Sequence, residues 1–436
     1  MKTKSILLSM VFALSLCGCG DKDKELLEPV RVDPEKEELK PIEPETGKPD
    51  VTEDPETRHS YKPVVLNETQ QAIHEKLQDF SWKLFKEVYA NREEGTNLMI
   101  SPISLEVDLG MFLNGLKDTA QQEILKTMGL QDFTVEQVND YFKTLMDGIE
   151  KADEAAIFKS ANSFWYNQRY TANADFLANI QDSYFAKAEA VNLADPQTKD
   201  VINAWCAEKT NNRIDKMLDK TDDSDLFHLM NAVYFKANWK DQFEKEMTDK
   251  QPFVYADGKT DTVDMMAQSL WTLYVETDKY QLCLKPFVDD AFQMLFVMPK
   301  EGVAMTEILS DDLVKVLKDE EKARYVTLML HAPKFTSEYT EKKLFNYMQN
   351  INPSFVLPSQ DIKLLDNYNE EMLLGAMQKT FFLMDEEGAE AAAVTDIWGV
   401  ATAIPDYTYM TLDHPFCYAI LESNTFSPLF IGYYGE

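Results

Sequence analysis

Histidine and cysteine are scarce in this sequence, with five of each among 436 residues. It contains no H-E-x-x-H pair and no C-x-x-C pair, so the common zinc motifs are absent. A G-x-S-x-G elbow, a Walker loop and a dinucleotide fingerprint are also missing. We therefore expect no enzyme, no metal and no cofactor. A hydrolase stays as a third hypothesis, because the members of a catalytic triad need only meet in space.

Basic residues are also few. Lysine and arginine number 43 against 75 acidic residues, which gives a formal net charge of -32. A chain of this charge repels phosphate backbones and anionic lipid headgroups. We expect no nucleic-acid partner.

No hydrophobic run is long enough to cross a bilayer comfortably. The longest near the start is the twelve-residue stretch 5–16, which follows Lys2 and Lys4 as in a secretory signal. It ends in Leu16-Cys17-Gly18-Cys19, which resembles a bacterial lipobox. We predict a lipoprotein signal peptide over 1–18 and a lipid on Cys19. Cys17 fits less well, because bulky Leu16 would precede the cut, and ordinary secretion remains an alternative.

The segment after Cys19 is poor in apolar and aromatic residues. Between Gly20 and Val65 it carries seven of the 18 prolines and fourteen acidic residues. Such a composition cannot offset the entropy of ordering, so 19–65 is predicted to be a disordered tether. The acidic residues directly after Cys19 resemble export signals of some Bacteroidetes lipoproteins. We expect anchoring to the outer membrane, facing outward, with a periplasmic orientation left open.

Three cysteines remain beyond the tether: Cys206, Cys283 and Cys417. Their odd number and wide spacing predict neither a disulfide framework nor a zinc site. Each has apolar or aromatic neighbours, so we expect buried small hydrophobic residues.

A periodic pattern begins near Leu66, and 66–436 is predicted to be one domain. Apolar residues from Ile73 to Val88 recur at helical spacing. Further helices are expected early, at 103–116, 119–129 and 197–218. Strand-like runs are expected late, near 228–236, 279–298, 325–335 and 409–434. Helices early and strands late, without regular alternation, predict an α+β fold.

The long connection over 385–407, DEEGAEAAAVTDIWGVATAIPDY, is unusual. Alanine and glutamate favour a short exposed helix, but loops of this length are usually functional. Read with a period of two from Ala389, one face is small or uncharged and both charges lie on the other. A strand with this alternation could enter an existing sheet, with Gly388 as its pivot.

This segment resembles the reactive-loop hinge of serpins, E-E-G-T-E-A-A-A-x-T, at nearly every position. Seven further blocks resemble serpin motifs in the same order: Asn97–Ser104, Asn162–Trp165, Ile202–Ile214, Asn231–Phe243, Val263–Met266, Pro333–Phe335, and the end pair Asp413–Phe416 with Leu429–Gly432. Several motifs in order are far more specific than one.

The resemblance implies a serpin fold, with early helices, large mixed or antiparallel sheets and an exposed reactive-centre loop. It implies a suicide inhibitor of serine proteases, which forms a covalent acyl complex and inserts the cleaved loop into the main sheet, a conformational change. It also implies a monomer. No basic cluster lies over 121–128, so a heparin-type site is not expected.

The resemblance assigns the loop residues by position. The hinge comprises Glu386, Glu387, Gly388, Ala389, Glu390, Ala391, Ala392, Ala393, Val394 and Thr395. The usual count places the reactive bond at Thr402-Ala403, with Ala403-Ile404 as the fallback. Small uncharged residues there predict an elastase-like or subtilisin-like target. Whether cysteine proteases are also trapped stays open.

The resemblance also assigns residues beneath the main sheet. Ser101, Ser104 and Asn231 match the shutter, where strands must part, and Trp239 matches the breach, where the loop enters. Gln378 stands where many serpins carry histidine, and an amide both donates and accepts hydrogen bonds. Core packing and hydrogen bonding are the plainer interpretation of Ser101, Ser104, Asn231 and Trp239. The alternative function is a non-inhibitory serpin-fold surface binding protein.

Overall fold

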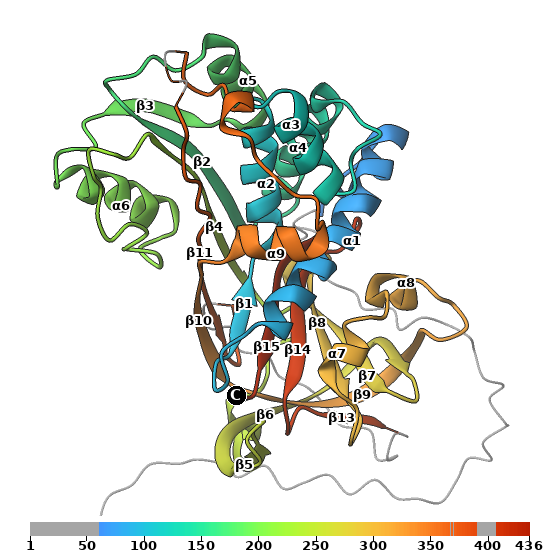
Figure 1. Cartoon of the computed structure of the whole chain (residues 1–436). Helices are drawn as coiled ribbons and strands as arrows, with labels where there is room; N and C mark the ends of the chain where they lie inside the picture. The colour runs from blue at the N-terminus through green and yellow to red at the C-terminus, as the bar shows by residue number, and fades with distance from the viewer. Residues whose placement is uncertain (1–60, 367, 369, 390–406) are drawn as a thin grey trace, which may run out of the picture. The chain divides into compact units, whose positions relative to one another are not determined.

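The computed structural model describes residues 61–366, 368, 370–389 and 407–436. These residues form a mixed α+β fold, as the order of the sequence patterns predicted (Figure 1). One large apolar cluster joins the helices to the sheets.

The helices gather mainly in the first half of the chain. Those in the described residues are α1 (Glu68–Ala90), α2 (Pro102–Leu113), α3 (Asp118–Thr127), α4 (Val135–Glu150), α5 (Ala174–Tyr184), α6 (Thr198–Lys209), α7 (Met305–Ile308), α8 (Leu313–Leu317) and α9 (Leu344–Ile351). In this part of the chain, none of them is both long and apolar enough to span a membrane.

Local signals explain two helix starts. Asn67 caps α1 in a reciprocal pair with Gln70, each side chain accepting from the backbone of the other. Pro102 is the first residue of α2. The N–H of this position has no partner within a helix, so the N–H that proline lacks costs no hydrogen bond. Ser101 stands just before it.

The largest sheet has nine strands. Its path, in spatial order, is β1 (Leu98–Ile100), β15 (Pro428–Tyr434), β14 (Phe416–Glu422), β8 (Phe292–Pro299), β7 (Tyr280–Pro286), β6 (Thr260–Glu276), β9 (Arg324–Pro333) and β13 (Thr408–Thr411), with β5 (Asp249–Val254) paired to β6. β13 is parallel to β9 and the other pairs are antiparallel.

The described residues also form two smaller sheets. One has four strands in the order β12 (Gly388–Ala389), β4 (Phe227–Asn238), β2 (Ile157–Asn167) and β3 (Lys187–Val191). The other is the antiparallel pair of β10 (Phe335–Glu341) and β11 (Gln378–Met384). Figure 1 shows α2 and α9 beside these strands and α6 on the far side of β2 and β4.

The sequence patterns predicted one helix that is too long and a folded part that begins too late in the chain. The predicted helix 197–218 ends at Lys209, because Thr210 bonds back to Cys206 and Asn211 and Asn212 adopt positive φ. Residues 61–65, predicted to belong to the disordered tether, pack on the fold. Val64 is 2% exposed, and the Tyr61 hydroxyl donates to Glu422 at 2.8 Å.

The prediction that these three cysteines are buried is confirmed. Cys206, Cys283 and Cys417 are free and buried. Burial raises the pKa of the Cys206 and Cys283 thiols to about 12, so neither is a reactive thiolate at neutral pH.

Candidate functional site

The edge of β4 that faces β11 is open over most of its length. On its other edge β4 pairs with β2 from Phe227 to Lys236. Toward β11, the described residues pair with it only at Ala237 and Asn238, through β12. β11 in turn pairs only with β10 among the described strands. An open edge presents unpaired N–H and C=O groups to any incoming strand.

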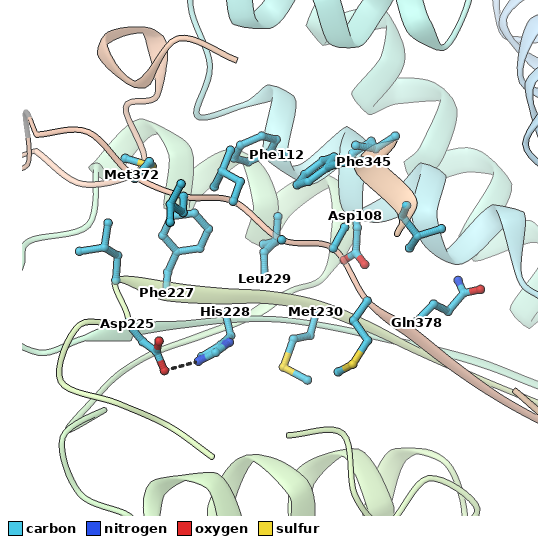
Figure 2. A pocket seen from close by; sticks show the side chains of 18 of the residues that line it. Asp108, Phe112, Asp225, Phe227, His228, Leu229, Met230, Phe345, Met372 and Gln378 are labelled. Atoms are coloured by element: carbon cyan, nitrogen blue, oxygen red, sulfur yellow. Dashed lines mark ion pairs between the residues drawn. The ribbon is translucent and has the colours of Figure 1, made fainter. Parts of the chain in front are cut away.

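A cavity of about 490 Å³ lies along this open edge (Figure 2). Its walls are residues 226–231 of β4 and the segment preceding it, the segment 371–378 that leads into β11, and one side of α2. A much smaller cavity lies further along, between 233–235 of β4 and 381–383 of β11. Two cavities therefore lie between β4 and the chain that forms and leads into β11.

Gln378 closes one side of the larger cavity. Its Nε2–H donates to the carbonyl oxygen of Ser101, and its Oε1 accepts from the N–H of Ser101, both at 2.8 Å. The Ser101 hydroxyl donates to the carbonyl oxygen of Leu429 at 2.7 Å. This network ties β11 to the start of α2 and to the nine-stranded sheet. Ser104 is buried one turn further along α2 and lines the cavity.

Asn231 lies in the middle of β4 beside the same cavity. Its Nδ2–H donates to Ser160 at 2.7 Å and to Asn162 at 2.6 Å, both on β2. Its Oδ1 is buried and has no hydrogen-bond partner among the described residues. A buried acceptor without a partner costs free energy, so an additional donor here would stabilise the fold.

Asp108 projects from α2 toward Asn231. Figure 2 shows its carboxyl group at the cavity, between α2 and β4. Burial raises the pKa of Asp108 well above its usual range, although a hydrogen bond from the Asn231 backbone opposes the shift. Its Oδ1 has no partner among the described residues. Asp108 therefore contributes a buried carboxyl group to the cavity wall, which Asp225 and Glu371 also line.

The far end of the cavity holds a second polar pair. His228 on β4 lies 3.5 Å from Asp225, measured from Nε2 to Oδ2, as the dashed line in Figure 2 marks. Burial lowers the pKa of His228, while Asp225 opposes the shift. His228 is therefore largely neutral at physiological pH.

At the other end of β4, the start of the predicted hinge has entered the sheet. Gly388 and Ala389 pair antiparallel with Asn238 and Ala237. Gly388 has φ +149°, and an added Cβ would lie 2.3 Å from the carbonyl oxygen of Ala237. Only glycine fits this approach of two backbones.

Trp239 lies directly beneath this pairing. Its ring stacks on Phe287, with centroids 4.4 Å apart and planes 10° from parallel. Its indole N–H donates to the carbonyl oxygen of Asp385 at 3.0 Å, and its backbone N–H donates to that of Glu387 at 2.9 Å. One buried tryptophan thus supports the residues that precede the pivot.

Two ion pairs hold the acidic start of the hinge. Lys334 Nζ lies 2.7 Å from Glu386 Oε2, and Lys245 pairs with Glu387. The Thr248 hydroxyl also donates to Glu386 at 2.9 Å. Burial alone would raise the pKa of Glu386, but the hydrogen bonds from Lys334, its own backbone and Thr248 together lower it. Glu386 is therefore ionised and anchored.

Lys285 is buried next to Trp239. Its Nζ lies 5.0 Å from the centroid of the Trp239 ring and 4.4 Å from that of Phe243. It donates to the carbonyl oxygen of Asp241 at 2.8 Å and to Gln268. Burial lowers its pKa to about 7, partly opposed by Asp241.

The residues predicted from the sequence fall into two groups. Ser101, Ser104, Asn231 and Gln378 gather around the large cavity, and Trp239 lies with Glu386, Glu387, Gly388 and Ala389 at the other end of β4. The remaining predicted residues lie outside the described residues: Glu390, Ala391, Ala392, Ala393, Val394, Thr395, Thr402, Ala403, Ile404 and Cys19.

Sequence reasoning missed Asp108 and Lys285. Asp108 stands four residues after Ser104, so helical spacing places both on one face of α2, and a charge within the apolar run 102–113 could have drawn attention. Lys285 sits in the apolar run 280–286, but nothing local pairs it with Trp239. In the described part of the chain, no three histidine, cysteine or acidic side chains gather as a metal site would require.

Comparison with known proteins agrees with this architecture. The family model described as "Serpin (serine protease inhibitor)" matches residues 75–435. Human neuroserpin is 28% identical over 374 residues, covering 82% of this chain and 90% of the relative. Human leukocyte elastase inhibitor is 28% identical over 371 residues, covering 81% and 96%. The native state of the thermophilic serpin tengpin is 28% identical with a TM-score of 0.76, covering 86% of this chain and 97% of that one.

The α+β fold predicted from the motifs is therefore confirmed as the serpin fold. Serpins are mostly protease inhibitors rather than catalysts. The family model spans most of the chain, from within α1 to the last strand. This chain belongs to the serpin family.

Proposed function

We propose that this protein is a suicide-type inhibitor of serine proteases. In this proposal, a protease attacks the loop near Thr402-Ala403 and forms an acyl-enzyme, and the cleaved loop then inserts beside β4 with the protease attached. The open edge of β4 is the observation that supports this most directly, because strand addition needs an unpaired edge and Gly388 and Ala389 already occupy its first two positions.

The register of β12 defines how insertion would continue. Gly388 opposes Asn238 and Ala389 opposes Ala237, so each further loop residue would oppose the preceding residue of β4. Glu390 would then face Lys236, and Thr395 would face Asn231. Continued to Phe227, the first residue of β4, this ladder would extend the loop strand to Gly399.

The same register would satisfy the unpartnered buried oxygen of β4. Directly opposed residues of an antiparallel pair point to the same face, so Thr395 would lie beside Asn231. Its hydroxyl could donate to Asn231 Oδ1, which lacks a partner among the described residues. The small residues Ala391 and Ala393 would share that face with Thr395.

The central experiment is trapping. The protein is incubated with elastase, chymotrypsin, trypsin, subtilisin and papain, and the mixture is denatured. We expect a denaturant-resistant complex with elastase or subtilisin, and the mass of the released C-terminal peptide should place the cleaved bond at Thr402-Ala403. Cleavage without any complex would instead support the non-inhibitory alternative, a serpin-fold surface binding protein.

Two neighbouring substitutions distinguish insertion of the loop from its recognition by the protease. Thr395→Arg would place a long charged side chain on the buried face of the inserting strand. Asp396→Arg places the same side chain on the other face. We expect Thr395→Arg to be cleaved without trapping and Asp396→Arg to trap normally; equal trapping by both would contradict the register.

The target class follows from the residues at the scissile bond. Thr402 and Ala403 are small and uncharged, which suits the shallow specificity pockets of elastase-like and subtilisin-like enzymes. The name of one relative, leukocyte elastase inhibitor, agrees with that class. Thr402→Arg should redirect trapping to trypsin; if trypsin stays unaffected, the bond lies elsewhere, first at Ala403-Ile404.

We further propose that the inhibitor is a lipid-anchored monomer on the outer membrane, facing outward. The lipid would sit on Cys19, and the acidic proline-rich segment after it would hold the domain away from the surface. Labelled palmitate should enter the wild type and Cys17→Ala but not Cys19→Ala. Protease accessibility on intact cells would distinguish the outward from the periplasmic orientation.

A further inference from the structure

An exposed aromatic patch lies on the nine-stranded sheet, on strands that the inhibitory mechanism does not use. Trp271 on β6 is 68% exposed, Tyr325 on β9 is 63% exposed and Tyr409 on β13 is 60% exposed. The rings of Trp271 and Tyr325 stack, with centroids 6.1 Å apart and planes 20° from parallel. Large exposed aromatic residues usually mark an interaction site when they cluster.

The strand register places these three side chains on one face. Leu273 opposes Tyr325, and Trp271 is two residues away on the same strand, so Trp271 and Tyr325 are diagonal neighbours. Tyr409 opposes Met329, which is four residues from Tyr325 and therefore on the same side of β9. Intervening residues of these strands point into the core, as buried Leu270, Leu328 and Met410 do.

The described residues of these three strands that alternate onto the patch carry no formal charge, in a chain of which 27% is charged. These residues are Ser269, Trp271 and Leu273 on β6, Tyr325, Thr327, Met329 and His331 on β9, and Tyr409 and Thr411 on β13. Burial lowers the pKa of His331, which keeps it neutral. A face of this composition offers apolar and hydrogen-bonding contact to a partner and little electrostatic steering.

We propose that this patch is a second contact surface for the target protease, beside the bait loop; the inference rests on the proposed inhibitory function. The patch is close to the scissile bond along the chain. Tyr409 follows Ala403 by six residues, which can span at most about 20 Å. A protease domain of roughly 200 residues has a radius of gyration of about 16 Å. A protease that holds Thr402-Ala403 in its cleft can therefore reach the patch.

The residue types fit that role. Tryptophan and tyrosine dominate the energetically important positions of protein interfaces, because they bury much area at a low entropic cost. The stack of Trp271 on Tyr325 fixes both rings before binding. The patch would raise the rate at which the target protease binds and cleaves the loop. It would thereby select among the many proteases that accept the small residues at the scissile bond.

The test compares Trp271→Ala/Tyr325→Ala with wild type, and with Phe185→Ala as a matched control. Phe185 is 62% exposed and follows α5, which lies at the opposite end of the molecule from β6, β9 and β13 in Figure 1. The measured quantity is the second-order rate constant for consumption of the loop, using whichever of elastase, chymotrypsin and subtilisin consumes the wild type fastest. Thermal unfolding checks that all three proteins fold equally well.

We expect about a tenfold lower rate constant for the double variant, and an unchanged rate constant for Phe185→Ala. The number of inhibitor molecules consumed per protease should not change. An equal rate for wild type and double variant would overturn the proposal. So would a sedimentation experiment in which the wild type dimerises and the double variant does not, because the patch would then serve self-association.

The same measurement keeps this inference separate from the proposed function. If the loop is cleaved without trapping, the inhibitory function fails, yet the rate constant of cleavage still reports whether the patch contributes. If trapping occurs and the rate constant does not depend on the patch, the inhibitory function stands and the patch proposal fails.

Discussion

Gln378 and Ser101, 277 residues apart, form a closed pair of hydrogen bonds, with the Gln378 side chain donating to and accepting from the Ser101 backbone at 2.8 Å each. Both residues are buried. The pair joins β11 to the start of α2 at the place where β4 and β11 are separated by the large cavity. An amide makes both bonds in one protonation state, so this connection does not titrate near neutral pH.

Gln378→Ala should therefore lower the free energy of unfolding by about 2 kcal/mol, because it leaves the buried N–H of Ser101 unpaired and removes one of the two donors to the Ser101 carbonyl oxygen. Urea unfolding at pH 7 measures the change, and the exposed Gln131→Ala should have almost no effect. Gln378→His makes a second comparison. It should unfold more readily below about pH 6.5, where a protonated imidazole can no longer accept. If the wild type loses the same amount of stability at acid pH, the amide does not have this role.

Asp108→Asn should stabilise the protein near neutral pH. The pKa of Asp108 is raised in the folded state by burial. A raised carboxyl pKa means that the folded state holds its proton more tightly than the unfolded state does. Stability therefore falls as pH rises from the unfolded pKa through the folded one, and the asparagine variant avoids that loss. We expect a gain of about 1 kcal/mol at pH 8, shrinking toward pH 4, in urea unfolding measured across this range.

The gain should be specific to the buried carboxyl group. Asp79 is exposed on α1, and its ion pair among the described residues is with Lys83, so Asp79→Asn should leave the pH dependence as it is. If Asp108→Asn instead loses stability at pH 8, the ionised carboxylate must be making a favourable contact in the cavity.

Lys285→Met should change how stability depends on pH above neutrality. Burial lowers the pKa of Lys285 to about 7, while an unfolded lysine titrates near 10.5. The unfolded state therefore binds more protons between these values, and the wild type gains stability as pH rises. Relative to Lys285→Met, that gain should be about 1 kcal/mol per pH unit between pH 7 and 9. Parallel stability profiles for the two proteins would show that Lys285 stays charged.

Gly388→Ala should disrupt the pairing of β12 with β4. A Cβ at Gly388 would lie 2.3 Å from the Ala237 carbonyl oxygen and 2.6 Å from the Asn238 Cα, and the positive φ adds backbone strain. We expect a loss of about 2 kcal/mol and faster amide exchange at Ala237 and Asn238. Gly258→Ala is the control: its φ is also positive, but its added Cβ would meet open space, so it should lose only about 1 kcal/mol.

The sequence by itself determined the family, the fold class and the burial of the cysteines. Those features follow from motifs that occur in a fixed order and from local periodicity, and both can be read directly from the sequence. Local chemistry also places the start of α1 at Asn67, through its capping residues. The same local reasoning failed at residues 210–218, because two asparagines with positive φ end α6 earlier than the apolar pattern suggests.

Only the tertiary structure decided which side chains meet. Asp108 lies beside Asn231, and Lys285 lies beneath the ring of Trp239, although each pair is separated by tens of residues or more. The stack of Trp271 on Tyr325 likewise depends on the register of β6 with β9. Such contacts are set by how strands pair and helices pack, and no local pattern encodes them, because pairing register is a property of two distant segments together.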